Sequence, residues 1–193
     1  MNKQKVPPLA VAGAPASVGM TDVEGLCELG RNMGKRLVEV WEEFKTVKQQ
    51  GEWAELEFMA KAARRCFRVC RPWGDTSAFD VGVEYRTNFL RVQVKSTTNR
   101  CGRGYWCDFS RHYRKVGDYT LEEVDLFAAY VIPVDAWYLI PAAVLMRDGK
   151  KGTMLCPVVQ PVKRKTFRYE RFREAWWVLT KTRRGLGRCE REE

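Results

Sequence analysis

The first regular pattern along the chain is helical. From Thr21 to Gln50 apolar residues recur every three or four positions, which predicts a helix or a helix pair. A second helix is predicted from about Gly51 to Cys66 on the same ground. Two of its carboxylates, Glu52 and Glu55, project in the same sector one turn apart, and the helical wheel does not choose between them. The apolar stripe of this second helix is expected to consist of Leu56, Met59, Ala60, Ala63 and Phe67.

After this helix the pattern changes to the alternation that is typical of strands. The segment from Ala78 to Tyr85 (AFDVGVEY) alternates with Asp80 on its polar side. The segment from Asn88 to Lys95 follows after a short turn, so the two predict a β-hairpin with Val92 and Val94 on the buried side. On that second strand Gln93 and Lys95 share the other face, which raises the question of what an amide and an ammonium do there together.

Further strands and one more helix are predicted in the second half of the chain. A strand with alternating aromatics is expected from about Tyr105 to Ser110. The runs AAYVIP and AWYLIP, at 128–133 and 136–141, predict two buried strands joined by a short turn, with Trp137 and Tyr138 in the core. The segment YERFREAWWVL, at 169–179, predicts a last amphipathic helix.

Charge narrows the classes of partner. The 193 residues fit one globular domain with additional residues at its ends, and 34 Lys and Arg against 24 Asp and Glu leave a net charge of +10, which favours a polyanion or an anionic membrane face. From Arg86 to Lys115, eight basic residues stand against the single acid Asp108 and are interleaved with aromatics. This composition suits a nucleic-acid backbone and its bases. A solvated basic surface around core aromatics is the alternative, and the segment alone does not decide between them.

Cysteine content and the chain start indicate the compartment. Seven cysteines are an odd number, their spacing matches no zinc module, and His112 is the only histidine, so idle thiols in a reducing cytoplasm are expected. Residues 1–20 are too interrupted by proline for a signal peptide and are expected to be a disordered leader. No apolar run reaches the length of a membrane span, so no membrane partner is expected.

Three polar side chains of the predicted hairpin can meet at one point. A carboxylate on one strand, Asp80, and the pair Gln93 and Lys95 on the next have the geometry for a divalent metal beside a phosphodiester. Mg²⁺ prefers oxygen ligands, and a lysine can orient the attacking water and offset charge in the transition state. Each residue also has an ordinary structural explanation, such as a turn cap or a solvent-facing strand position.

Three short motifs follow one another along the chain: GEWAE at 51–55 on the predicted helix, PWGDTSAFD at 72–80 before and on the first strand, and RVQVKST at 91–97 on the second strand. Their arrangement resembles the PD-(D/E)XK nuclease superfamily, and more closely its branch related to group I intron homing endonucleases, in which glutamine replaces the usual acid of the last motif. The segment at 119–141 is also similar to the strand pair that follows the catalytic core in that branch, so the resemblance covers roughly residues 50–145. It implies an α/β fold with a restriction-endonuclease-like core, in which helices flank a central mixed β-sheet.

The resemblance also implies roles for single residues. Asp80 would be the central metal ligand, Gln93 a neutral ligand through its amide oxygen, and Lys95 the catalytic lysine. Glu55 would complete the site, and the family pattern favours it over Glu52. Because Gln93 removes one negative charge, metal binding should be weaker unless Glu55 compensates.

The resulting hypothesis is a cytoplasmic DNA endonuclease that uses Mg²⁺ or Mn²⁺ and acts as a homo-oligomer, a dimer or tetramer. Two alternatives stay open: a structure-selective nuclease of the Holliday-junction type, and an inactive DNA-binding descendant of the fold. The expected organisation is a leader at 1–20, an N-terminal helical segment at 21–50 that contacts other subunits, the nuclease-like core at 51–145, and a basic C-terminal extension with one helix at 146–193. The residues expected to hold DNA are Ser96, Arg100, Arg103, Arg111, Arg114 and Lys115.

Overall fold

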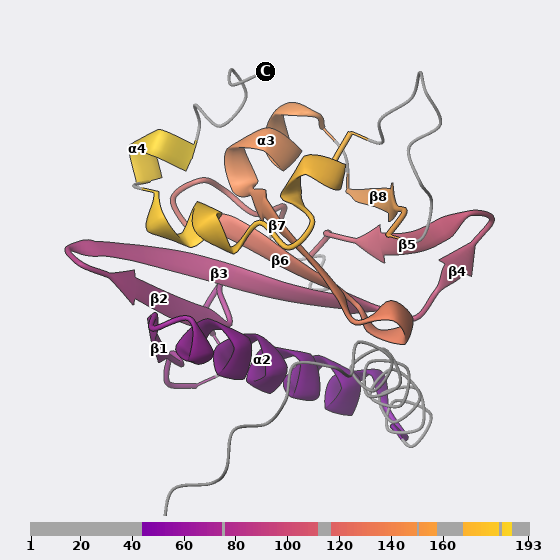
Figure 1. Ribbon diagram of the computed structural model, residues 1–193, viewed down its shortest axis with the longest axis horizontal. Helices are drawn as coiled ribbons and strands as arrows, with labels where there is room; N and C mark the ends of the chain where they lie inside the picture. The colour runs from indigo at the N-terminus through magenta and orange to yellow at the C-terminus, as the bar shows by residue number, and fades with distance from the viewer. Residues whose placement is uncertain are drawn as a thin grey trace, which may run out of the picture.

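A five-stranded mixed β-sheet forms the centre of the protein (Figure 1). The computed structural model describes residues 44–74, 76–111, 117–149, 151–157, 168–181 and 183–186. In the strand order β1-β2-β3-β6-β7, β3 pairs parallel with β6 and all other pairs are antiparallel. The strands are β1 (Arg68–Cys70), β2 (Val81–Tyr85), β3 (Asn88–Thr97), β6 (Leu126–Val131) and β7 (Ala136–Pro141). The predicted hairpin and the predicted buried strand pair are both confirmed.

A smaller three-stranded sheet continues from the end of β3. Its order is β4-β5-β8, with β4 at Arg100–Cys101, β5 at Gly104–Asp108 and β8 at Gly152–Leu155. Strand β5 is the aromatic strand expected from Tyr105 to Ser110, although it ends earlier. The β4–β5 hairpin extends beyond the C-terminal end of β3, at the right of Figure 1. Basic residues on this hairpin therefore lie at one end of the molecule.

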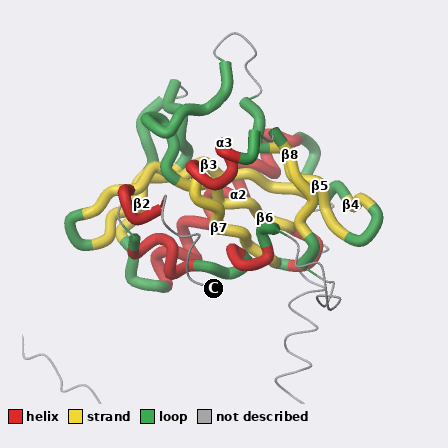
Figure 2. The backbone as a smooth tube through the Cα atoms, turned by 90° about the horizontal axis from the view of Figure 1, so that it is seen from above, coloured by secondary structure: helices red, strands yellow, loops and turns green. Residues whose placement is uncertain are grey.

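Helix α2 (Val47–Arg64) runs along one face of the central sheet (Figure 1). It begins before Gly51 because Thr46 caps it: the Thr46 hydroxyl accepts a hydrogen bond from the Gln49 backbone N–H at 3.2 Å. On the other face lie the short helix α3 (Ala142–Arg147) and the turn η2 (Glu170–Phe172). Figure 2 shows the strands of both sheets running across the middle of the molecule. The expected mixed sheet flanked by helices is thus confirmed.

The buried stripe of α2 differs from the predicted one. Ala54, Phe58 and Ala62 are fully buried at a spacing of four, whereas Leu56 is 58 % exposed. Of the other predicted members only Phe67 is buried, Met59 is half-buried, and Ala60 and Ala63 are exposed. The reason is tertiary packing. The sheet presents a bulky aromatic surface, and a helix face with one large side chain between two small ones fits against it. Phe58 fills that position, so the two alanines let the helix approach the sheet on either side of it.

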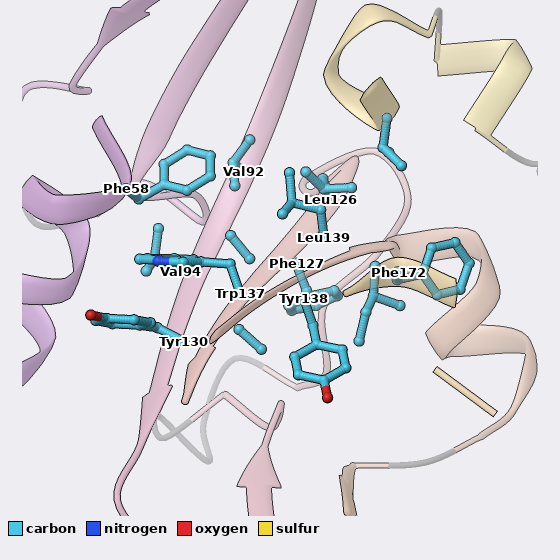
Figure 3. Packing of buried hydrophobic residues seen from close by; sticks show 14 of the residues in the cluster. Phe58, Val92, Val94, Leu126, Phe127, Tyr130, Trp137, Tyr138, Leu139 and Phe172 are labelled. Carbon is cyan, nitrogen blue, oxygen red and sulfur yellow. The ribbon is translucent and has the colours of Figure 1, made fainter. Parts of the chain in front are cut away.

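Aromatic rings make up the layer between α2 and the sheet. Trp137 stacks on Tyr130 with ring centroids 4.3 Å apart and planes 8° from parallel. Phe58 packs 5.6 Å from Trp137 and 5.7 Å from Trp176 of the turn η3 (Trp176–Thr180). Figure 3 shows Phe58 facing Val92 from β3, while Tyr138 lies on the opposite side of the sheet. The buried placement predicted for Val92, Val94, Trp137 and Tyr138 is confirmed.

The amphipathic helix expected at 169–179 is wrong. The segment forms the two 3₁₀ turns η2 and η3 instead. Between them Arg173 forms an isolated antiparallel β-bridge with Tyr138 of β7, and Glu174 adopts a left-handed backbone conformation at φ 50°. The Glu174 backbone N–H donates to the Trp137 backbone carbonyl at 2.7 Å, and the Glu174 carboxylate accepts a hydrogen bond from the Trp137 backbone N–H at 2.8 Å. These bonds satisfy the outer edge of β7, a sheet edge that would otherwise be left open. A short helix, α4 (Arg183–Leu186), follows.

Several expectations concern residues outside the described ranges. They are the leader at 1–20, the helical segment at 21–50 except for its last residues, and Arg114 and Lys115. Among the residues that the structure describes, no helix combines the length and the apolar character that crossing a membrane requires.

We expect Phe58→Ala to lower the free energy of unfolding by about 3–5 kcal/mol, because it empties the aromatic layer under α2. Urea unfolding monitored by circular dichroism measures this loss. Leu56→Ala on the same helix is the matched control and should change stability by less than about 0.5 kcal/mol, since that side chain faces solvent. Equal losses in the two variants would contradict the observed helix face.

Candidate active site

The carboxylate of Asp80 is fixed from two sides. Asp80 lies directly before β2, and its backbone N–H donates to the Val92 carbonyl on β3 at 3.0 Å. Its Oδ2 accepts hydrogen bonds from the Val94 backbone N–H at 2.8 Å and from the Gln93 side-chain amide at 2.5 Å. Both bonds go to the same oxygen, so Oδ1 is the atom placed to bind an additional ligand. The hairpin register thus brings Asp80 and Gln93 together, as the sequence predicts.

Gln93 is buried in the middle of β3, where it pairs in register with Phe127 of β6. Its amide nitrogen Nε2 points to Asp80. The amide oxygen of the same group is therefore the candidate metal ligand, in line with the role that the family resemblance implies. A carboxylate at this position could not donate the bond that holds Asp80.

Lys95 lies on the same face of β3 as Gln93, two residues further on. Its ammonium donates to the Ser110 carbonyl at 3.1 Å and to the Tyr119 hydroxyl at 3.4 Å. It also lies 5.4 Å from the centroid of the Tyr119 ring. Ser110 and Tyr119 line a pocket of about 260 Å³ that extends to Leu145 on α3. The lysine is thus oriented by neutral groups at the wall of an open pocket.

Helix α2 brings Glu55 to the site and leaves Glu52 outside it. The side chain of Glu55 is 17 % exposed, and one of its oxygens lies 2.8 Å from Nη2 of Arg71, the residue after β1. The side chain of Glu52 is 50 % exposed and lies 3.9 Å from the Lys48 ammonium. The structure therefore separates the two carboxylates that the helical wheel left equivalent.

The two carboxylates of the site are electrostatically strained. Burial, followed by the negative charge of Asp80, raises the pKa of Glu55 to about 7, although Arg71 opposes the shift. Burial also raises the pKa of Asp80 above its usual range, against the Val94 N–H, the Lys95 charge and the Gln93 amide. Two desolvated carboxylates that repel each other are an environment that a cation would stabilise.

The donor set fits a hard divalent cation. Asp80, Glu55 and the Gln93 amide offer oxygen atoms only, the type of ligand that Mg²⁺ prefers. Within the described ranges, no group of three or more His, Cys, Asp or Glu side chains is arranged for a metal. A metal at this site would therefore use the neutral amide, main-chain carbonyls or water beside the two carboxylates.

The predicted DNA-binding residues fall into different places. Arg100 and Arg103 are exposed on the β4–β5 hairpin. Ser96 points to the α2 side, where its hydroxyl accepts a hydrogen bond from the Gln50 amide at 3.1 Å. Its side chain therefore lies on the opposite face of β3 from that of Lys95. Arg111 is partly buried, because its guanidinium bonds Glu123 at 3.0 Å and packs over the Tyr119 ring.

Comparison with known proteins agrees with this geometry. A family model described as PD-(D/E)XK endonuclease matches residues 45–177. The chain belongs to this family. The solved structure of a bacterial homing endonuclease, I-Ssp6803I, is similar with a TM-score of 0.60 and 26 % identity over 77 % of this chain and 99 % of that chain. No protein with a curated description matches the chain. The suspected superfamily and its core fold are confirmed, and PD-(D/E)XK nucleases typically use a divalent metal.

Two neighbours of the candidate site in this member of the PD-(D/E)XK endonuclease family were not identified from the sequence. Arg71 pairs with Glu55. The feature of the sequence that could have identified it is its position at the start of the loop that ends at Asp80. Tyr119, which orients Lys95, lies 24 positions further along the chain and carries no local signal.

The raised pKa of Glu55 gives stability a defined pH dependence. The pKa of Glu55 in the folded protein, about 7, lies above its ordinary value of 4.5, so the folded state favours the protonated side chain. The stability that this preference contributes is fully present below about pH 4.5 and is lost as the pH rises through 7. In metal-free buffer Glu55→Gln should therefore be more stable than the wild type near pH 8, by about 1–3 kcal/mol, and similar to it near pH 5.

Thermal and urea unfolding with a chelator present would measure this difference. Glu52→Gln, one turn earlier and exposed, is the matched control and should change stability little at either pH. A Glu55→Gln variant that is less stable than the wild type at the higher pH would contradict the crowded-carboxylate interpretation.

Proposed function

We propose that the protein is a DNA endonuclease that hydrolyses phosphodiester bonds with Mg²⁺ or Mn²⁺. In this proposal Asp80, Gln93 and Glu55 hold the metal, and Lys95 acts at the attacking water. The observation that carries it is the convergence on β3: Gln93 and Val94 fix the Asp80 carboxylate while the Lys95 ammonium is held on the same face. The raised pKa values of Asp80 and Glu55 also favour a cation at these two carboxylates.

The metal, when bound, would polarise the scissile phosphate and lower the pKa of a bound water. The protein contributes position. The hydrogen bonds from Gln93 and Val94 fix the direction of the Asp80 carboxylate before any ligand binds, so little reorganisation is needed.

Lys95 has one donor left for the reaction. An ammonium has three N–H groups, and the Ser110 carbonyl and the Tyr119 hydroxyl accept two of them. The third can donate to the attacking water or to a phosphate oxygen as negative charge develops there. Arg111 supports this arrangement indirectly, because its guanidinium packs over the Tyr119 ring and thereby fixes the tyrosine.

The β4–β5 hairpin is the proposed hold on the DNA backbone. Arg100 and Arg103 are exposed there, shortly after the strand that carries Lys95. A hairpin of this kind can follow a phosphate backbone away from the cleavage point. Ser96, Arg114 and Lys115 stay proposed contacts on sequence grounds.

The assembly and its location are also proposed. Cutting both strands of a duplex favours a symmetric dimer or tetramer, and the segment at 21–50 is the proposed subunit contact. The cytoplasm is the proposed compartment, where the DNA substrate is available and thiols stay reduced.

Cleavage of supercoiled plasmid and of a synthetic four-way junction tests the proposed function directly. With Mg²⁺ or Mn²⁺ the wild type should cut, and Asp80→Ala and Lys95→Ala should each lose about 10²–10⁴-fold in rate, because one removes a metal ligand and the other the ammonium proposed to act at the water. The metal-induced rise in melting temperature should vanish in Asp80→Ala and persist in Lys95→Ala.

Glu84→Ala is the matched control, since Glu84 lies on β2 but pairs with the exposed Arg68. It should cut like the wild type. Preference for the junction over the plasmid would favour the Holliday-junction type of nuclease. Salt-sensitive DNA binding without cleavage under either metal would contradict the nuclease proposal and favour an inactive DNA-binding descendant of the fold.

Restoring the usual acid at position 93 separates metal affinity from the stability of the metal-free protein. In Gln93→Glu the donor to Asp80 is lost and a third carboxylate enters the site, so the metal-free protein should lose about 1–3 kcal/mol at neutral pH. Metal should bind more tightly, which calorimetric titration with Mn²⁺ measures. Weaker metal binding in this variant would show that residue 93 does not ligate the metal.

A further inference from the structure

Trp73 is a tryptophan that nothing in the described structure covers. Its side chain is 100 % exposed. The other exposed tryptophans are about half covered: Trp106 is 44 % exposed and lies against Gly152, and Trp177 is 49 % exposed beneath the Lys181 ammonium. Tryptophan is a large apolar side chain that proteins rarely leave fully in water. An uncovered indole therefore indicates a surface that is completed by a partner.

The loop itself holds the indole outward. Pro72 precedes it with a fixed φ, and Gly74 follows at φ 81°, a left-handed conformation that glycine adopts without strain. Arg71 ties the start of the loop to helix α2 through its contact with Glu55. At its other end the loop runs into Asp80. The loop that carries Trp73 thus begins at the partner of Glu55 and ends at Asp80, whose backbone N–H is bound to the Val92 carbonyl.

Trp73 lies close along the chain to Arg71, the arginine that contacts the candidate site. One residue, Pro72, separates Trp73 from Arg71, so their Cα atoms lie within about 7 Å of each other. Arg71 contacts Glu55, and its charge also lowers the pKa of Asp80. Trp73 is thus two positions along the chain from an arginine that contacts one carboxylate of the candidate site and acts electrostatically on the other. For DNA, the groups next to the reacting phosphate are the bases and sugars of the flanking nucleotides.

The surroundings are basic, which selects a nucleic acid over a protein as the occupant. Arg64, Arg68 and Arg71 are all exposed on the same stretch of chain, at the end of α2, on β1 and at the start of the loop, and two of them also pair with a carboxylate, Arg68 with Glu84 and Arg71 with Glu55. An aromatic ring next to arginines matches a nucleotide, whose base stacks and whose phosphate carries the charge. A second copy of this chain would bring a net positive surface to a positive surface.

We propose that Trp73 stacks on a nucleobase next to the phosphodiester held at Asp80, and so positions the DNA for cleavage. This inference rests on the proposed function and adds a contact to the bases themselves. Stacking on a base is tolerant of sequence, because every base has a π-face. Trp73 would then fix where the strand lies relative to the metal ligands rather than which sequence is read.

Fluorescence anisotropy of a short, fluorescein-labelled duplex of mixed sequence, with Ca²⁺ in place of Mg²⁺ and over a series of KCl concentrations, tests the proposal on the full chain. Trp73→Ala should raise Kd about 5- to 100-fold, while the slope of log Kd against log salt stays as in the wild type, since no charge is removed. Trp73→Phe should recover most of the affinity because a phenyl ring also stacks. Arg103→Ala should instead reduce the slope by about 1.

Trp177→Ala is the matched control: it makes the same chemical change at an exposed tryptophan on η3, and it should bind DNA like the wild type. Wild-type affinity in Trp73→Ala would overturn the proposal. So would a change in sedimentation mass with DNA affinity intact, which would place Trp73 in a contact between subunits. If the wild type itself shows no salt-dependent DNA binding, the proposed function fails; if it binds and cuts while Trp73→Ala matches it, only the role of Trp73 fails.

Discussion

The alternation of side chains along β3 is the constraint on which the rest of the structure depends. Successive residues of a strand point to opposite faces, so Val92 and Val94 face the core under α2 while Gln93 points to Asp80 and Lys95 to Tyr119. Pairing with β2 on one side and β6 on the other fixes this orientation. A slip of one residue would expose the valines and bury the lysine against the aromatic layer. Core packing and site geometry are thus specified by the same register.

Local patterns in the sequence were sufficient for the strands and for the polar side chains of the hairpin. The β2–β3 pairing follows from two alternating segments and a short turn, so the meeting of Asp80 and Gln93 could be predicted. The choice of Glu55 over Glu52 came from the family pattern, and burial beside Asp80 agrees with it. The order of the elements was enough to suggest the family, which the match over residues 45–177 shows.

Contacts between segments that are distant in sequence were beyond the same reasoning. The buried face of α2 depends on Trp137 and Trp176, which lie far along the chain from Phe58. The segment at 169–179 has a helical pattern, yet its backbone bonds to the edge of β7 because Glu174 completes that edge through Trp137. Arg111 lies in a basic run, but Glu123 and Tyr119 engage its guanidinium. In each case tertiary hydrogen bonding or packing outweighs a local preference.

Gln93 shows how a neutral residue can suit a site built for a cation. Burial raises the pKa of both Asp80 and Glu55, the charge of Asp80 raises that of Glu55 further, and a third carboxylate would add repulsion whenever the metal is absent. The amide avoids that cost and also donates a bond that a carboxylate could not, which fixes Asp80 in place. The consequence is weaker attraction for the metal, because one negative charge is missing. Glutamine at this position therefore favours an ordered metal-free site, at the expense of metal affinity, and leaves Glu55 to supply the second charge.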